Sequence, residues 1–319
     1  MTTTHVTLAQ TELAAPRVLR VGAGRRQRIR GSPPPGEPRR IGYLYVLPAL
    51  VLYVAFVLAP FVHTAILSLY SWDGVTPAHF VGLRNFRDIF SNPVLLSAFE
   101  HAFILIIFYA ALPTVIGLLL AGIMARSPVR GMSLFSTVLF LPYVIAPTAV
   151  AVVWRWALAP DGPLNQLLHD VGLGGLAKPW LGDFNWALPS VGLIGTWVLY
   201  GLAMVLFLAG AQKIPRSLYD AARIDGAGPV WEFLSVTLPG LRNELVVVLV
   251  LTVTAALRNF DTVYVATSGG PGTATTVPSY LVYNTAFVVG SVGAAAALGL
   301  LLAVLIFVLN SAITRLGSQ

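Results

Sequence analysis

Long apolar runs alternate with short polar connections along this chain. Connections rich in Pro, Gly, Asp and Asn occupy residues 70–98, 159–187 and 267–285. Each apolar run reaches or exceeds the roughly 20 residues that a helix needs to cross about 30 Å of hydrocarbon. The pattern predicts an all-α integral membrane protein with six transmembrane helices, near residues 41–69, 99–125, 134–158, 188–211, 244–266 and 286–311.

The composition supports a membrane protein. Hydrophobic residues make up 56% of the 319 residues and charged residues only 10%, whereas about a quarter of a soluble domain is charged. The chain contains no cysteine, which excludes disulfides, thiol nucleophiles and cysteine metal sites.

The first 40 residues differ from the rest of the chain. They hold eight arginines and the run Pro33-Pro34-Pro35, with no apolar segment long enough for a helix core. We therefore predict a disordered basic cytoplasmic tail over residues 1–40, followed by a transmembrane domain over residues 41–316. The basic cluster either sets the membrane topology or contacts membrane lipid headgroups.

The basic residues also predict an orientation. With the N-terminus inside, fifteen of the twenty Lys and Arg residues fall on the inner side, so both termini are expected to be cytoplasmic. The net charge of +7 is therefore explained by basic residues that set the membrane topology. Because it needs no other explanation, we expect no nucleic-acid partner.

Motifs for covalent chemistry are missing. Neither Lys178 nor Lys213 follows a glycine, so the chain has no P-loop for a nucleotide. The five histidines are scattered, and no serine lies in a Gly-x-Ser-x-Gly turn. We expect no catalytic residue, no metal site and no cofactor held by this chain.

One polar segment, residues 212–243, interrupts the apolar pattern between the fourth and fifth runs. Ser217 and Asp220 form a Ser-x-x-Asp pattern, a weaker relative of the capping box, and Asp220 would lie in the first helical turn. Gly226 suits the left-handed residue that ends a helix. We predict a short helix over Leu218–Asp225, and Pro229 is expected to begin the next helix.

A helix of two turns is not stable alone in water and needs a docked surface. Ala221 and Ala222 leave its backbone accessible, while Leu218 and Tyr219 offer apolar contact. From the residues alone, a partner-docking helix and an ordinary capped turn remain open.

The spacing within this segment resembles a known motif. Asp220-Ala221-Ala222, three residues, Gly226, nine residues and Val236-Thr237-Leu238-Pro239 are similar to the EAA loop of ABC importer permeases, Glu-Ala-Ala-x3-Gly-x9-Ile-x-Leu-Pro. Asp220 replaces Glu and is one methylene shorter, and Val236 replaces Ile.

The resemblance extends over nearly all of residues 41–316. It points to the carbohydrate-uptake branch, which includes the maltose and glycerol-3-phosphate permeases. The runs that carry it are Gly82-Leu83-Arg84-Asn85-Phe86, Phe140-Leu141-Pro142, Gly162-Pro163-Leu164-Asn165, Phe207-Leu208-Ala209-Gly210-Ala211-Gln212-Lys213-Ile214-Pro215 and Ser268-Gly269-Gly270-Pro271-Gly272.

The resemblance implies the permease fold of a type I ABC importer in the bacterial plasma (inner) membrane. It implies a second homologous permease, an ABC ATPase dimer that binds ATP and Mg²⁺, and an extracytoplasmic solute-binding protein. The short helix would be the coupling helix, which docks on the ATPase. Its implied coupling residues are Leu218, Tyr219, Asp220, Ala221, Ala222, Asp225 and Gly226.

The substrate path is predicted near the outer part of the fifth run. Arg258 and Asp261 are three residues apart, so they could pair on one helix face. The functional alternative has Asn259 and Asp261 bind sugar hydroxyls while an aromatic ring stacks on the sugar. The candidate path residues are Asn259, Phe260, Asp261, Tyr264, Trp197, Tyr200, Tyr283 and Asn284.

Two other functions stay open at this stage. The first is an ABC permease for a polyol or glycerol phosphate. A phosphate would favour extra basic residues in the path, and only Arg258 stands out. The second is a membrane scaffold or sensor that does not transport.

Overall fold

A computed structural model describes residues 39–126 and 131–317. The predicted disordered tail lies outside the described residues except for Arg39 and Arg40. The chain divides into two units, Met1–Val57 and Leu58–Gln319. In the first unit, helix α1 (Arg39–Tyr53) leads into the π-helix η1 (Val54–Leu58). Every described side chain from Tyr43 to Val57 is exposed, as suits an apolar helix whose neighbours are lipid or another chain.

Four helical segments are long and apolar enough to cross a membrane, namely Tyr43–Leu67, Pro93–Met124, Ala187–Ala211 and Val292–Gly317. Two further helix pairs qualify if each bent pair is one span. They are Met132–Val144 with Pro147–Ala157, bent by 93°, and Pro229–Gly240 with Arg242–Leu257, bent by 71°. The predicted all-α membrane fold is confirmed, with six spans as the upper count.

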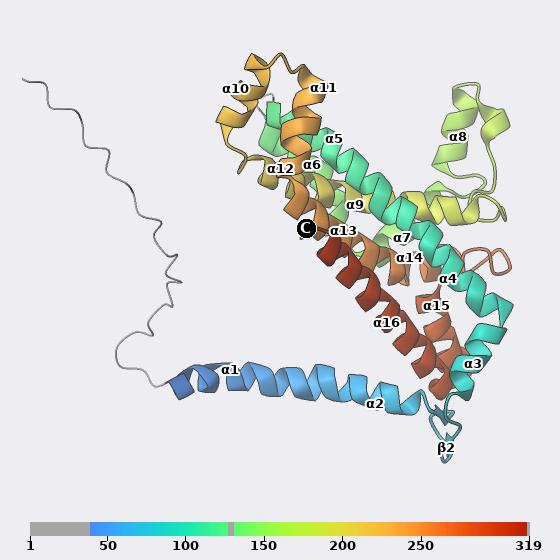
Figure 1. The fold of residues 1–319 in the computed structure, drawn as a ribbon. Coiled ribbons are helices and arrows are strands. Elements are labelled where there is room, and N and C mark those ends of the chain that lie inside the picture. Colours follow the sequence, from blue (N-terminus) through green and yellow to red (C-terminus); the bar gives the residue numbers. More distant parts are fainter. Residues whose placement is uncertain (1–38, 127–130, 318–319) are drawn as a thin grey trace, which may run out of the picture. The chain divides into compact units, whose positions relative to one another are not determined.

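The long helices of the second unit form the bundle in Figure 1. In chain order they include α2 (Ala59–Leu67), α4 (Pro93–Ile106), the π-helix η2 (Ile107–Ala111), α5 (Leu112–Arg126), α6 (Met132–Val144) and α7 (Pro147–Ala157). They are followed by α9 (Ala187–Ala211), α13 (Arg242–Leu257), α14 (Asp261–Ala266) and α16 (Val292–Gly317).

Short elements fill the connections. The connections before α4, after α7 and after α14 contain β1 (Tyr70–Ser71), β2 (His79–Phe80), α3 (Arg84–Ser91), α8 (Pro163–Asp170), the 3-10 helix η3 (Gly174–Leu176), α15 (Pro278–Tyr283) and the π-helix η5 (Asn284–Val288). The two strands pair antiparallel. The connection between α9 and α13 contains α10 (Arg216–Ile224), α11 (Pro229–Glu232), the π-helix η4 (Phe233–Thr237) and α12 (Leu238–Gly240).

Three predicted spans are not continuous helices. The third, 134–158, breaks at Ile145 and Ala146, because Pro147 pushes the preceding residue out of the helical region; both residues are extended. The fifth, 244–266, breaks over residues 258–260. The sixth begins only at Val292, since Gly290 with a φ of +73° separates it from η5.

The break in the fifth span rules out the alternative in which Arg258 and Asp261 pair on one helix face. Arg258 follows the last residue of α13, and Asp261 begins α14. No ion pair joins these two side chains among the described residues.

Helix α9 lies at the centre of the second unit and is the most buried of the long helices. Its packing against α5 is close because Gly117 has no side chain. A Cβ added at Gly117 would lie 2.7 Å from the Ala203 Cβ and 2.8 Å from the Met204 nitrogen. Small residues allow such helix contacts in membranes.

We expect Gly117→Val to destabilise the bundle by about 1–3 kcal/mol or more, because the backbone of α9 cannot yield to the new side chain. The measurement is the thermal unfolding midpoint of the detergent-solubilised protein. Leu119→Val, at an exposed position of the same helix, is the matched control. Equal midpoints for the two variants would contradict the packing argument.

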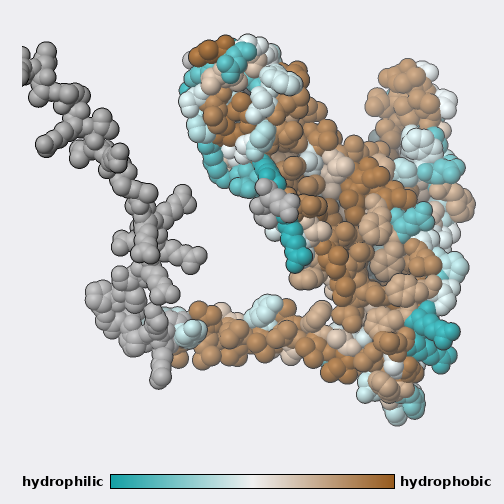
Figure 2. All heavy atoms as spheres, viewed as in Figure 1, coloured by the Kyte–Doolittle hydropathy of each residue, from teal (hydrophilic) through white to brown (hydrophobic). Residues whose placement is uncertain are grey.

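The surface matches a membrane setting. Figure 2 shows apolar residues over the face of the bundle that it presents, while hydrophilic residues gather around the α10 end and around α3. Many large apolar side chains on the long helices are exposed, including Leu119, Leu193 and Phe307. Without lipid or another chain, such a surface would be unfavourable in water.

Candidate functional site

Helix α10 forms where the sequence predicted a short helix, but it starts earlier. It spans Arg216–Ile224, with Pro215 at the capping position and no side-chain cap bond. The predicted Ser217 cap is therefore wrong, and Asp220 lies in the middle of the helix. The fixed φ of Pro215 and its extended ψ of 133° let the chain enter the helix directly.

The end of α10 follows the prediction. Gly226 has a φ of +83°, its N–H donates to the Arg223 carbonyl at 3.0 Å, and the Ala227 N–H donates to the Ala222 carbonyl at 2.9 Å. These two bonds form the Schellman arrangement that ends a helix and satisfies its last carbonyls. Pro229 begins α11, as predicted.

Gly226→Val is expected to loosen the end of α10, because a left-handed conformation costs most L-residues roughly 1–2 kcal/mol. A steric clash is not the reason for the expected loosening, since no atom lies within 4 Å of a Cβ at this position. Hydrogen–deuterium exchange of the α10 amides should accelerate. Gly226→Asn is the control, because asparagine tolerates this conformation better; unchanged exchange in both variants would refute the assignment.

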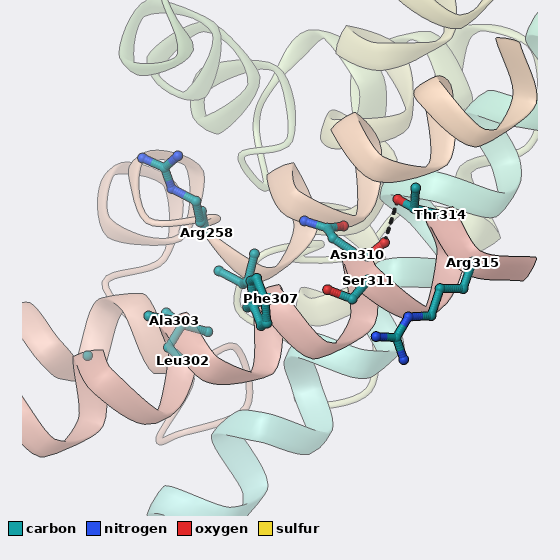
Figure 3. A pocket seen from close by; sticks show the side chains of 10 residues that line it. Arg258, Leu302, Ala303, Phe307, Asn310, Ser311, Thr314 and Arg315 are labelled. Carbon is teal, nitrogen blue, oxygen red and sulfur yellow. Dashed lines mark hydrogen bonds between the residues drawn. The ribbon is translucent and has the colours of Figure 1, made fainter. Parts of the chain in front are cut away.

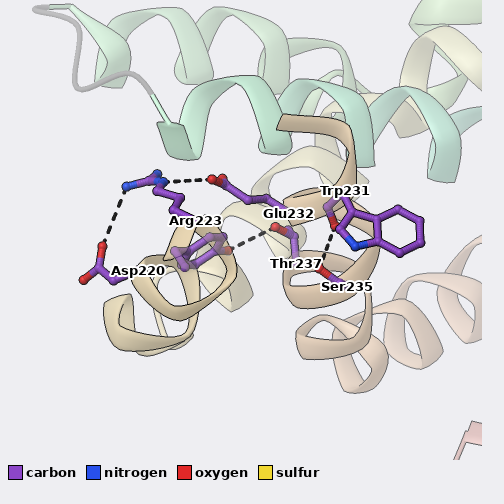
Figure 4. A network of polar contacts seen from close by, with 7 residues as sticks. Asp220, Arg223, Trp231, Glu232, Ser235 and Thr237 are labelled. Atoms are coloured by element: carbon purple, nitrogen blue, oxygen red, sulfur yellow. Dashed lines mark hydrogen bonds and ion pairs between the residues drawn. The ribbon is translucent and has the colours of Figure 1, made fainter. Parts of the chain in front are cut away.

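A polar network fixes α10 to the segment that follows it (Figure 4). The Arg223 Nε donates to the Glu232 Oε1 at 2.8 Å, and the Glu232 side chain is only 8% exposed. Asp220 lies 3.7 Å from the other side of the guanidinium. The Glu232 hydrogen bond and charge raise the pKa of Arg223 above its ordinary value.

The Tyr219 hydroxyl adds a second link, to the Thr237 Oγ1 at 3.1 Å. Tyr219 thus turns partly inward, while Leu218 and Ile224 remain exposed together with Trp231 of α11. The result is a short helix joined to the following segment by two side-chain contacts, with Leu218 and Ile224 exposed among polar and charged residues.

The seven predicted coupling residues all lie on α10 or in the turn that ends it. The sequence did not predict the residues that hold the helix, which are Arg223, Glu232 and Thr237. Arg223 and Glu232 are on different helices, so no helical spacing relates them.

A second candidate site lies between the α6–α7 break and the α13–α14 break. A cavity of about 380 Å³ is lined by Tyr143, Ile145 and Pro147 at the α6–α7 break and by Arg258–Thr262 at the α13–α14 break. Backbone that leaves a helix inside a membrane protein is tolerated where it is buried in protein or lines a water-filled cavity.

Polar groups in this cavity have spare hydrogen-bonding capacity. Asn259 is 7% exposed, and its Nδ2 finds no partner among the described residues. A buried amide without a partner is unfavourable, and a ligand or water can satisfy it. Asp261 lines the same cavity and is exposed.

Some predicted path residues gather here and others do not. Phe260 lines the cavity and stacks on Tyr264 at 5.1 Å between ring centroids, and Tyr283 lies 5.3 Å from Phe260. Trp197 instead packs against Trp154 at 5.5 Å. Tyr200 and Asn284 do not line the cavity, and Asn284 begins η5. Tyr109, Tyr143 and Thr262, which line it, were missed.

Residues 114–318 match the family described as "Binding-protein-dependent transport system inner membrane component". A probable ABC transporter permease of Bacillus subtilis is 36% identical over 273 residues, which is 85% of this chain and 93% of the relative. The trehalose/maltose transport permease of Thermococcus litoralis is 32% identical, over 87% of this chain and 94% of its own.

Two further similarities bear on substrate and fold. The lactose transport permease of Rhizobium radiobacter is 32% identical, over 77% of this chain and 83% of its own. The crystal structure of a bacterial ABC transporter involved in the import of alginate superposes with a TM-score of 0.74 at 22% identity, over 88% of this chain and 95% of that one. At this identity the structural likeness shows a shared fold.

Proposed function

Because this chain belongs to the family of binding-protein-dependent transport system inner membrane components, we propose that it carries a sugar or oligosaccharide across the bacterial plasma membrane. It is a permease subunit of an ABC importer and not an enzyme, and a separate ATPase supplies the energy. Both termini lie on the cytoplasmic side in this proposal, which places α10 there too.

The cavity between the broken helices supports the sugar assignment. Asn259 and Asp261 offer an amide donor and a carboxylate acceptor, and Phe260, which stacks on Tyr264, offers an aromatic ring. Sugars present hydroxyls that need both donors and acceptors, and sites for small molecules combine apolar walls with a few such groups. Relatives named for lactose, for trehalose/maltose and for diacetylchitobiose agree with this class.

The α10 helix is the proposed contact with the ATPase. It is short and exposed on its outer face. Two side-chain hydrogen bonds, Arg223–Glu232 and Tyr219–Thr237, join its other face to α11 and η4. A rigid link of this kind can pass ATPase movement on to α12 and α13, which follow η4 directly. ATP and Mg²⁺ would bind to a pair of ATPases, a second permease would complete the pathway, and a binding protein would deliver the sugar on the other side.

A second candidate substrate is a phosphorylated solute such as glycerol phosphate. Arg258 lines the cavity with an exposed guanidinium, and arginine binds phosphate well. A glycerol-3-phosphate permease of Pectobacterium atrosepticum is 33% identical over 267 residues.

The test is uptake by the reconstituted importer. The chain is produced together with a second permease, an ABC ATPase and a solute-binding protein from the same organism, and the complex is placed in proteoliposomes. We expect ATP-dependent accumulation of a radiolabelled sugar that the binding protein retains. Accumulation of glycerol 3-phosphate in place of any sugar would favour the second candidate, and ATP hydrolysis with no accumulation of either would refute both.

A further inference from the structure

A groove of about 780 Å³ runs along the α16 helix and reaches the end of α13. Figure 3 shows Asn310, Ser311 and Thr314 following one another along α16, with Arg258 beyond one end of this row and Arg315 at the other. The row and the two arginines line the groove together with apolar residues such as Phe307.

The row of polar residues is unusual for a helix surface that would face lipid. Asn310, Ser311 and Thr314 share one face by their spacing. The Asn310 Nδ2 donates to the Thr254 Oγ1 at 2.8 Å, but its buried Oδ1 finds no donor among the described residues. Polar groups within the hydrocarbon region face the bundle interior or a water-filled cavity, and an orphaned amide oxygen needs a donor such as water.

Arg258 connects this groove with the candidate substrate cavity, because its side chain lines both. On α16, the groove residue Ala303 lies roughly 18 Å from Arg315 at 1.5 Å per residue. The groove therefore extends from the break in the fifth span to the end of the bundle where α16 terminates. Arg258 follows the last residue of α13 and lies inside the fifth predicted span, where an arginine is unfavourable against lipid. We therefore expect water or protein around it.

We propose that this groove, here called the α16 passage, is one wall of an aqueous exit route from the substrate cavity to the cytoplasm. The inference rests on the proposed transport function and its orientation. Arg258 places positive charge at the end next to the substrate cavity, and no acidic residue is among the described residues that line the groove. The α16 passage therefore admits neutral and anionic solutes and disfavours cations.

Cysteine accessibility tests the route directly, because the natural chain contains no cysteine. Ser311→Cys and Thr314→Cys are introduced singly into the full importer, and inside-out vesicles are treated with an anionic, membrane-impermeant methanethiosulfonate. Val308→Cys is the matched control, since Val308 is 55% exposed on the same helix but does not line the groove. We expect both passage cysteines to react at least about tenfold faster than the control.

A cationic reagent of similar size tests the charge. It should react with the passage cysteines about tenfold more slowly than the anionic one, and Arg258→Gln should reduce this difference. Equal rates for the two reagents in the unmodified background would overturn the charge selectivity.

Other outcomes overturn the route itself. If both passage cysteines react as slowly as Val308→Cys, the groove faces lipid or a neighbouring subunit; cross-linking to the second permease identifies the subunit. Sugar uptake is measured in the same variants before labelling. Normal uptake with unreactive cysteines refutes the α16 passage while the proposed function stands, whereas an importer that accumulates no solute even without substitutions refutes the proposed function.

Discussion

Replacing Glu232 with alanine is expected to uncouple ATP hydrolysis from uptake, although Glu232 belongs to α11 and not to α10. Its side chain is 8% exposed and accepts the Arg223 Nε at 2.8 Å. Without that carboxylate, α10 keeps only the Tyr219–Thr237 bond among the side-chain links described here. The helix can then yield when the ATPase moves, and the movement no longer reaches the spans.

The expected result is a loss of uptake of roughly tenfold or more, the size of a typical coupling between distant sites. ATP hydrolysis by the assembled importer should persist. The measurement is the ratio of solute molecules accumulated to ATP molecules hydrolysed in proteoliposomes. A fall in this ratio with intact assembly supports the role of the ion pair, whereas loss of assembly would indicate that Glu232 is needed only for folding.

Two variants control for this outcome. Glu232→Gln keeps an acceptor for the Arg223 Nε and should retain part of the coupling. Asp88→Ala removes an exposed ion pair with Arg84, in which the charged atoms are 3.9 Å apart and both side chains are more than half exposed. Such surface ion pairs contribute little to stability. The ratio of solute accumulated to ATP hydrolysed in Asp88→Ala should therefore equal that of the natural protein. A ratio in Glu232→Ala equal to that in Asp88→Ala would refute the mechanical link.

The sequence predicted what depends on local backbone chemistry. Gly226 at the end of α10 and Pro229 at the start of α11 appear as expected, because each conformation is encoded by the residue that adopts it. The start of α10 was misjudged for a related reason. Two local signals competed, Pro215 and Ser217, and the rigid proline determined the start.

Breaks within apolar runs were harder to predict. The α6–α7 break has a local cause in Pro147, and that signal was available. The α13–α14 break has no proline, and part of its support comes from far along the chain. The Asn259 carbonyl, released from the helix, accepts the Ser279 hydroxyl at 2.9 Å. A tertiary contact twenty residues away cannot be read from the local pattern.

The same distinction applies to the candidate substrate residues. Asn259, Phe260 and Asp261 were predicted because polar residues in an apolar run stand out. Trp197 was predicted for its size alone, and the structure packs it on Trp154. Tyr109 and Tyr143 were not predicted as cavity residues, because a tyrosine within an apolar helix resembles a packing residue. Only the helix breaks of the folded chain bring the two side chains to one cavity.

The helix break also changes what Asp261 can do, and Asp261→Ala is expected to reduce uptake by roughly tenfold or more. On a continuous helix, Asp261 would have faced Arg258 one turn away. At the start of α14 it lines the cavity, exposed and without an ion-pair partner among the described residues. A free carboxylate beside Asn259 can accept hydrogen bonds from solute hydroxyls, and charged acceptors make the stronger bonds.

The prediction separates a binding role from a structural one. Asp261 also lies in the first turn of α14, where negative charge favours the helix. If that were its whole contribution, Asp261→Asn and Asp261→Ala would lower the unfolding midpoint, and uptake by the protein that remains folded would be normal. If Asp261 binds the solute, the unfolding midpoint and the assembly with the ATPase should be unchanged in both variants. Uptake should fall, and it should fall less in Asp261→Asn.

Asp161→Ala is the control, because it removes the same charge in the exposed connection before α8, away from the cavity. This variant should transport normally. Normal uptake by Asp261→Ala would remove this carboxylate from the substrate path and leave Asn259 as its main polar group.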